Sequence, residues 1–210
     1  MRATDAYRDL LDLGRDLISS TEARTRWQVS PGTAAYRLRA LEDAGLVRRV
    51  RRGLWALKTD IDAFVVPPYL TAPFPAYVSV WSALSYHDMI EQIPREISVA
   101  SLDRARRIET SLGTYQVHHL APEVFGGFEG SEVSGYLATP EKAVFDTVYL
   151  RAAVGTRAYF PELLLPSTFD DAALKGWTEK IKAPRQRTLV SRHIRDMLKH
   201  AAREQLPAAR

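Results

Sequence analysis

The sequence predicts an α+β protein: an N-terminal helical unit that ends in a basic hairpin, then a mixed α/β unit that ends in helices. Helix-start signals precede amphipathic segments near both ends of the chain, a proline-rich stretch separates the two units, and segments that alternate like strands occupy the middle. At 210 residues the chain is long enough for two small domains, which we place at 1–66 and 67–210.

Composition narrows the classes of function. Hydrophobic residues make up 46% and charged residues 26% of the chain, which is typical of a folded soluble protein. The chain has no cysteine, which excludes disulfides, thiolate nucleophiles and cysteine metal sites. Charged residues interrupt the apolar positions at the start, and no apolar run approaches ~20 residues, so neither a signal peptide nor a membrane span is expected. We therefore expect a cytoplasmic protein.

The net charge of +4 hides an uneven distribution of charge. Residues 1–58 carry 12 Lys and Arg against 7 Asp and Glu, residues 59–182 carry 10 against 16, and residues 183–210 carry 7 against 2. A basic surface attracts nucleic acid and an acidic one repels it. The two ends and the middle are therefore expected to meet different partners.

Two helices are expected at the start of the chain. Residues 5–18 place apolar side chains near helical spacing, which predicts an amphipathic first helix. A short second helix is expected after Ser19 or Ser20, either of which can cap it, with Ala23 and Trp27 four residues apart on one face.

A third helix has a clear start signal. Ser30 is the expected N-cap, Pro31 suits the first turn, and the helix is expected to run to about Ala44. The side expected to face the core comprises Ala34, Leu38, Leu41 and Gly45. The opposite side carries hydrogen-bonding and cationic groups, and comprises Thr33, Tyr36, Arg39 and Ala40, with Arg37 on a flank.

Residues 45–58, GLVRRVRRGLWALK, predict a basic hairpin. Gly45 ends the preceding helix, and the strands Leu46–Arg51 and Leu54–Lys58 are joined by a tight Arg-Gly turn. Because side chains alternate along a strand, apolar residues can cover the core while the arginines project outward or crowd the turn. The apolar set is Leu46, Val50, Trp55 and Leu57, and the arginines are Arg48, Arg49, Arg51 and Arg52.

This order of elements is that of a winged helix-turn-helix, in which the hairpin is the wing. The third helix then lies in the major groove, and an arginine-rich wing lies beside the phosphate backbone. A solvated surface patch is the alternative for an isolated run of charge, and for single residues base contacts and phosphate contacts both stay open. The residues predicted to bind DNA are Ser30, Thr33, Tyr36, Arg37, Arg39, Arg48, Arg49, Arg51 and Arg52.

The second unit begins with a proline-rich segment. Residues 58–77 favour an extended connector over a helix. Residues 78–94 then predict a helix that ends at Pro94, and residues 95–120 alternate like strands around turns at Asp103 and Gly113. We expect a small antiparallel sheet here.

Three helices are expected in the rest of the chain. Thr139 as N-cap and Pro140 in the first turn start a helix with an apolar stripe, and a modest helix follows between residues 170 and 182. A long last helix from Pro184 keeps a basic face in solvent, which suits a second nucleic-acid contact or an acidic partner. This face comprises Arg185, Arg187, Arg192, Arg195, Lys199 and Arg203.

Over almost its whole length the chain resembles the AbiEi-like antitoxins, transcriptional regulators of bacterial toxin–antitoxin pairs whose toxin is nucleotidyltransferase-like. The resemblance rests on GLVRRVRRGLWAL, on VSVWSALSYHDMIEQIP leading to REISVAS, and on YLATPEKAVFDTVYL. It implies a repressor that binds inverted repeats in its own promoter through the N-terminal domain and opposes the toxin, directly or indirectly, through the C-terminal domain. Residues 86–88 (Tyr-His-Asp) depart from the glycine-containing turn that the family often has, which leaves the end of that helix open.

Catalytic and metal sites have little support in the sequence. His118 and His119 are adjacent on a predicted strand and point to opposite sides, so they cannot share one metal, and no cofactor or metal is expected. The FGGFEG segment, residues 125–130, lacks the spacing and lysine of a phosphate-binding loop and is interpreted as glycine turns. Lys142 and Asp146, four residues apart, are interpreted as an intrahelical salt bridge.

Two alternative functions stay open beside the antitoxin. One is a phosphotransferase, similar to protein kinases, that inactivates the toxin by covalent modification. The other is a regulator without a toxin, whose second domain senses a ligand or mediates dimerisation.

Overall fold

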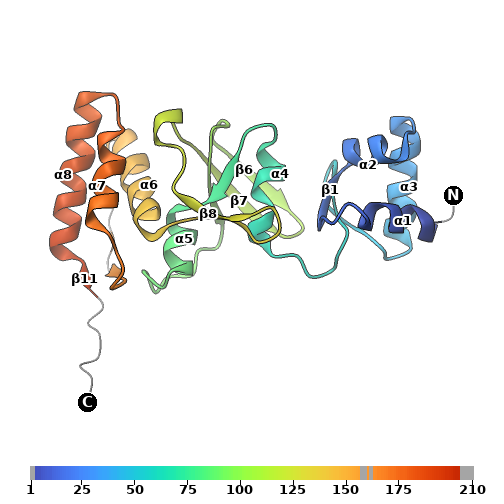
Figure 1. The fold of residues 1–210 in the computed structure, drawn as a ribbon, viewed down its shortest axis with the longest axis horizontal. Helices are drawn as coiled ribbons and strands as arrows, with labels where there is room; N and C mark the ends of the chain where they lie inside the picture. Colours follow the sequence, from blue (N-terminus) through green and yellow to red (C-terminus); the bar gives the residue numbers. More distant parts are fainter. Residues whose placement is uncertain (1–2, 157–159, 161–162, 204–210) are drawn as a thin grey trace, which may run out of the picture.

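The computed structural model describes residues 3–156, 160 and 163–203. Within these residues the chain is mixed α+β, with eight α-helices, a three-stranded antiparallel sheet and a six-stranded mixed sheet. Figure 1 shows the first three helices at one end of an elongated molecule, the large sheet in the middle and the last helices at the other end. The predicted α+β class is confirmed. No helix of the described chain combines the length and the apolar character that a membrane crossing needs.

The N-terminal unit contains three helices and three short strands. Its elements are α1 (Ala3–Leu11), β1 (Leu17–Ser19), α2 (Ser20–Trp27), α3 (Pro31–Asp43), β2 (Arg48–Arg51) and β3 (Leu54–Ala56). The strands form an antiparallel sheet in the order β1-β3-β2. The prediction of one helix over residues 5–18 was wrong at its end, because Gly14 takes a positive φ of 65° and Leu17 and Ile18 pair with β3.

The helix starts and the hairpin agree with the sequence prediction. The Ser19 hydroxyl accepts a hydrogen bond from the backbone of Glu22, whose side chain accepts one from the Ser19 backbone, which is a capping box. Ser30 caps α3, and Gly45 ends this region in a left-handed conformation with φ 69°. In the hairpin Val47 is buried and Leu46 only partly so, a shift of one position from the predicted core residue.

The proline-rich connector contains more helix than predicted. It forms a 3₁₀ turn, η1 (Ala63–Val65), and a short helix, α4 (Pro67–Thr71). The extended-connector prediction was wrong here because Pro67 and Pro68 occupy the first turn of α4, where a missing backbone N–H costs no hydrogen bond.

The large sheet is mixed, which corrects the expected small antiparallel sheet. Its strands are β4 (Ala76–Val78), β5 (Ile97–Ser101), β6 (Arg106–Thr110), β7 (Gly113–His119), β8 (Phe128–Ser131) and β9 (Gly135–Ala138), with the 3₁₀ turn η2 (Pro122–Val124) after β7. The order is β6-β7-β5-β4-β9-β8, and the pairs β5·β7 and β4·β9 are parallel. Alternation within a strand predicts its two faces but not its neighbours, so the parallel pairings were missed.

Helices cover one face of this sheet. They are α5 (Val80–Tyr86), α6 (Pro140–Ala153), α7 (Asp171–Glu179) and α8 (Pro184–His200), and two short strands, β10 (Leu164–Leu165) and β11 (Ala202–Arg203), pair in parallel. The predicted helix over 78–94 was too long: α5 ends at Tyr86, and Asp88 has φ 54°. Thr139 caps α6 as its start signal predicted, and Asp170 caps α7, the helix expected between residues 170 and 182. The side chain of Arg203 lies outside the described residues.

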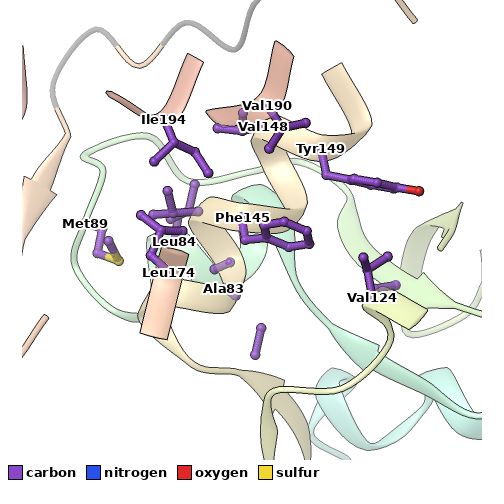
Figure 2. Close-up of a cluster of buried hydrophobic side chains, with 14 of the residues drawn as sticks. Ala83, Leu84, Met89, Val124, Phe145, Val148, Tyr149, Leu174, Val190 and Ile194 are labelled. Carbon is purple, nitrogen blue, oxygen red and sulfur yellow. The ribbon is translucent and has the colours of Figure 1, made fainter. Parts of the chain in front are cut away.

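Two apolar clusters lie on the two faces of the large sheet. One face packs against the helices, and Figure 2 shows Phe145 and Val148 of α6 in this cluster together with Val190 and Ile194 of α8. The other face packs against the N-terminal unit, in a cluster that joins Val50 and Leu54 of the hairpin to buried residues of the sheet. Those sheet residues are Ala76, Val99, Ile108, Tyr115 and Val117. The predicted boundary after residue 66 falls within this shared cluster, which includes Val65 and Val66.

Candidate nucleic-acid interface

Helix α3 has one buried side and one free side. Ala34, Leu38 and Leu41 are at most 1% exposed and pack in the core of the N-terminal unit. On the opposite side Tyr36 is 74% exposed, although tyrosine is a residue that soluble proteins usually bury in part. The predicted residues Thr33 and Arg39 are also exposed, and Arg37 is half-buried. Gly45 was expected on the buried side, but this was wrong: it lies beyond the end of the helix and is exposed.

The start of α3 is fixed by its cap. The Ser30 hydroxyl oxygen accepts a hydrogen bond from the Thr33 backbone N–H at 3.2 Å and lies 2.9 Å from the Thr33 hydroxyl oxygen. Two of the predicted DNA-binding side chains therefore stabilise the helix start. Both remain exposed, so the same hydroxyls and the free backbone N–H groups of the first turn face solvent.

All four hairpin arginines are exposed. Arg48, Arg49 and Arg51 lie on β2, and Arg52 lies in the turn beside Gly53, whose φ of 84° suits glycine. A register shift between Arg49 and Arg51 marks a bulge in the hairpin. Among the described residues no carboxylate lies within 4.0 Å of these guanidinium groups, so no ion pair there neutralises their charge.

A hydrogen bond connects the hairpin to α3. The backbone N–H of Arg49 donates to Oε1 of Glu42, in the last turn of the helix, at 3.1 Å. This contact holds the start of β2 against the end of α3. The exposed residues of the helix and the arginines of the hairpin thus belong to neighbouring parts of one unit.

Tryptophans of the core support two of the cationic side chains. The Arg37 guanidinium lies 5.7 Å from the ring centre of Trp27, and that of Arg49 lies 5.9 Å from the ring centre of Trp55. The Trp55 indole N–H in turn donates to the Ser20 hydroxyl at 2.9 Å. Such cation–π contacts restrict a long side chain without neutralising its charge. The charge of both arginines therefore stays available to an anion.

The large sheet also holds the hairpin, which the sequence did not indicate. The backbone N–H of Ser111, between β6 and β7, donates to the Val50 carbonyl oxygen at 2.9 Å. The Ser111 hydroxyl donates to the Arg49 carbonyl oxygen at 3.1 Å. A serine in a turn more than sixty residues away carries no sequence signal for this role. It satisfies backbone groups of an edge strand that would otherwise face solvent.

The Lys142–Asp146 pair of α6 is not part of this interface. The two side chains form the expected salt bridge, but both have no exposed surface. Burial lowers the pKa of Lys142 and raises the pKa of Asp146, and the attraction between their charges opposes both changes. Because neither side chain reaches solvent, the pair cannot bind a metal–nucleotide complex. The pair therefore gives no support to the phosphotransferase alternative.

The two neighbouring histidines differ in burial. His119 is exposed and its Nδ1 lies 3.1 Å from the Asp103 carbonyl oxygen, whereas His118 is half-buried. No group of three potential metal ligands occurs among the described residues.

No protein-family model matches this chain, and no curated protein matches it in sequence.

Proposed function

We propose that the N-terminal unit is a winged helix-turn-helix that binds double-stranded DNA. Helix α3 enters the major groove, and the β2–β3 hairpin lies along the phosphate backbone. The observation that carries this proposal is the exposure of the four hairpin arginines, which have no carboxylate partner among the described residues. The hairpin is anchored by Glu42 and Ser111, so its arginines can bind phosphate groups from a fixed position. A guanidinium group binds two phosphate oxygens at once.

The residues on α3 suit a different part of DNA. Tyr36 and Arg39 project from the free side, and arginine there can donate two hydrogen bonds to a guanine edge in the major groove. Ser30 and Thr33, at the N-terminus of the helix, suit a phosphate, since unpaired backbone N–H groups bind anions there. We assign sequence reading to Tyr36, Arg37 and Arg39, and positioning to the cap residues and the hairpin.

The experiment that tests DNA binding compares salt dependence. Each phosphate neutralised contributes about −0.9 to the slope of log K against log salt concentration. The double variant Arg51→Ala/Arg52→Ala should therefore bind every duplex more weakly and should flatten the slope by about 2. Fluorescence anisotropy with the DNA upstream of the gene and with a scrambled duplex measures both quantities.

A matched control removes the same charge at the other end of the molecule. Arg185→Ala/Arg192→Ala takes two exposed arginines from α8 and should leave the slope nearly unchanged. Equal loss in both variants would mean that DNA does not bind preferentially at the hairpin, and an unchanged slope in the hairpin variant would refute the assignment. Arg39→Ala should weaken binding to the upstream DNA by more than it weakens binding to the scrambled duplex.

The biological role that we propose is that of an antitoxin that represses its own promoter and counteracts a nucleotidyltransferase-like toxin through its C-terminal unit. The support is the resemblance in sequence motifs to AbiEi-like antitoxins, together with the exposed arginines of the hairpin in the N-terminal unit. Inverted repeats in the promoter would place two copies at a fixed spacing on the DNA.

Co-expression tests the antitoxin role. A nucleotidyltransferase-like protein encoded beside this gene should arrest growth alone, and this chain should relieve the arrest. The Arg51→Ala/Arg52→Ala variant should still relieve it, because we assign the two roles to different units. The intact mass of the toxin then distinguishes mechanisms: an added phosphate favours the phosphotransferase, and an unchanged mass favours binding or indirect action. Failure to relieve the arrest would contradict the antitoxin role.

A further inference from the structure

A cavity of about 660 Å³ opens between α6 and the large sheet. Its floor is formed by Ser98 of β5 and by Gln116 and His118 of β7. One wall is formed by Trp81 of α5, by Thr147, Leu150 and Arg151 of α6, and by Val154 just beyond its end. Ile90 and residues 92–96 form another wall. Pockets of about 300–1,000 Å³ are those in which proteins bind small molecules.

The cavity lies beside the part of the sheet that packs against α5 and α6. Residues of β4, β5 and β9, among them Tyr77, Ala100 and Ala138, are buried in the cluster shared with α5 and α6. Strand β7 follows β5 in the sheet, and β6 forms its edge. The polar side chains of Gln116 and His118 lie there, on the face opposite to Tyr115 and Val117 of the other core cluster.

The charged groups that line the cavity are Arg95, Arg151 and the carboxylate of Glu96. Arg151 has no ion pair among the described residues, and the His118 imidazole has no hydrogen bond within them. Burial, and secondarily the charge of Arg151, lowers the pKa of His118, so this imidazole is neutral at neutral pH and can donate one hydrogen bond. The acidic Glu96 at the edge is held by Arg107 at 2.8 Å.

Apolar side chains surround these donors. Ile93 is 88% exposed and Val154 is 70% exposed, and both line the opening. Trp81 and Leu150 lie in the wall and are only partly buried. Exposed apolar side chains around a cavity indicate a ligand-binding site, because an apolar ligand displaces water from them.

We propose that this cavity binds a small organic anion with an apolar body, such as an aromatic or medium-chain carboxylate. The carboxylate accepts hydrogen bonds from Arg151 and His118, and the body lies against Trp81, Leu150 and Val154. The charge of the acid is matched by an arginine that has no partner of its own. This site is separate from the DNA-binding surface, and its test does not depend on DNA binding.

The test is a titration of the full chain with each probe, monitored by backbone and side-chain NMR. The probes are 4-phenylbutyrate and octanoate, each compared with its neutral amide at millimolar concentration. Saturable shifts are expected at Ser98, Gln116, His118 and Arg151. A hydrogen bond between charged groups corresponds to about a tenfold change in affinity, so each acid should bind about tenfold more tightly than its amide.

Two variants assign the charge preference to one residue. Arg151→Gln removes an exposed guanidinium and should reduce the preference for the acid to about twofold or less while leaving the affinity for the amide unchanged. Arg185→Gln removes an equal charge from α8 and should preserve the preference. The proposal is overturned if neither acid causes shifts, or if the shifts cluster outside the cavity. It is also overturned if acid and amide bind equally, or if Arg151→Gln keeps the full preference for the acid.

Discussion

Replacing Lys142 with methionine tests what the buried ion pair contributes to the fold. The ammonium group donates to Oδ1 of Asp146 and, at 2.6 Å, to the Val124 carbonyl oxygen. The hydroxyls of Tyr77 and Ser79 donate to the other carboxylate oxygen at 3.0 and 2.7 Å. Methionine keeps most of the apolar stem but removes the charge, so the variant leaves a buried carboxylate with two hydrogen bonds and no cation.

The expected loss is large for a single substitution. Removing one partner of a buried ion pair costs about 3–5 kcal/mol, because the remaining charge stays desolvated. The Lys142 ammonium also lies 4.5 Å from the ring centre of Trp177 and 4.7 Å from that of Phe145, and these cation–π contacts are lost. The two hydroxyl donors offset part of the cost. We therefore expect the free energy of unfolding to fall by about 4 kcal/mol at neutral pH.

A second substitution separates charge from packing. In Lys142→Met/Asp146→Asn no charge remains, and the amide oxygen of asparagine still accepts hydrogen bonds from Tyr77 and Ser79. Because the uncompensated charge is gone, the double variant should recover about 1–2 kcal/mol relative to Lys142→Met. Urea unfolding followed by tryptophan fluorescence and by circular dichroism measures both differences.

The loss should also depend on pH. Burial raises the pKa of Asp146, and Lys142 opposes this rise, so removing Lys142 raises the pKa of the folded state further. A raised pKa in the folded state favours folding at low pH, and this contribution is lost as pH rises through that pKa. The deficit of Lys142→Met relative to the natural chain should therefore shrink as pH falls from 7 toward about 4. A deficit independent of pH, or a double variant less stable than the single one, would refute the reasoning.

Three further substitutions test other elements by the same unfolding measurement. Ser30→Ala removes the α3 cap and should cost about 1 kcal/mol, and a loss below a few tenths would show that the cap is dispensable. Gly127→Ala places a Cβ 2.5 Å from Trp177 at φ 71° and should cost clearly more than Gly155→Ala, where φ is 73° but no atom lies within 4 Å; similar costs would mean that backbone strain dominates. Phe145→Ala empties a fully buried position and should cost about 3–5 kcal/mol, and a cost under about 1 kcal/mol would contradict its place in the core.

Helix starts were the most predictable part of the fold. Ser30 with Pro31 and Thr139 with Pro140 combine a side-chain acceptor with a residue that fits the first turn, and both start helices where expected. These signals act over a few residues and do not depend on distant contacts. The hairpin was predictable for the same reason, because its turn needs Gly53 and its strands follow each other directly.

Long-range contacts were the least predictable part. Strands β5 and β7 pair in parallel although β6 lies between them in sequence, and no local pattern specifies that choice. Leu17 and Ile18 have helical spacing with the preceding residues, yet they form a strand because they pair with β3. At the candidate interface, the residues of α3 and the hairpin follow from local sequence, whereas the anchoring Ser111 follows only from tertiary structure.

The apolar cluster under the hairpin joins the proposed DNA-binding unit to the large sheet. Val50 and Leu54 share a buried cluster with Ile108 and Val117. If the two units move together on DNA, a rotation of α3 about the duplex turns the far end of the molecule through the same angle. On a palindromic operator, moving one half-site by about 5 base pairs would carry the second copy to the opposite side of the DNA. The spacing between the half-sites would then determine whether the two C-terminal units can contact each other.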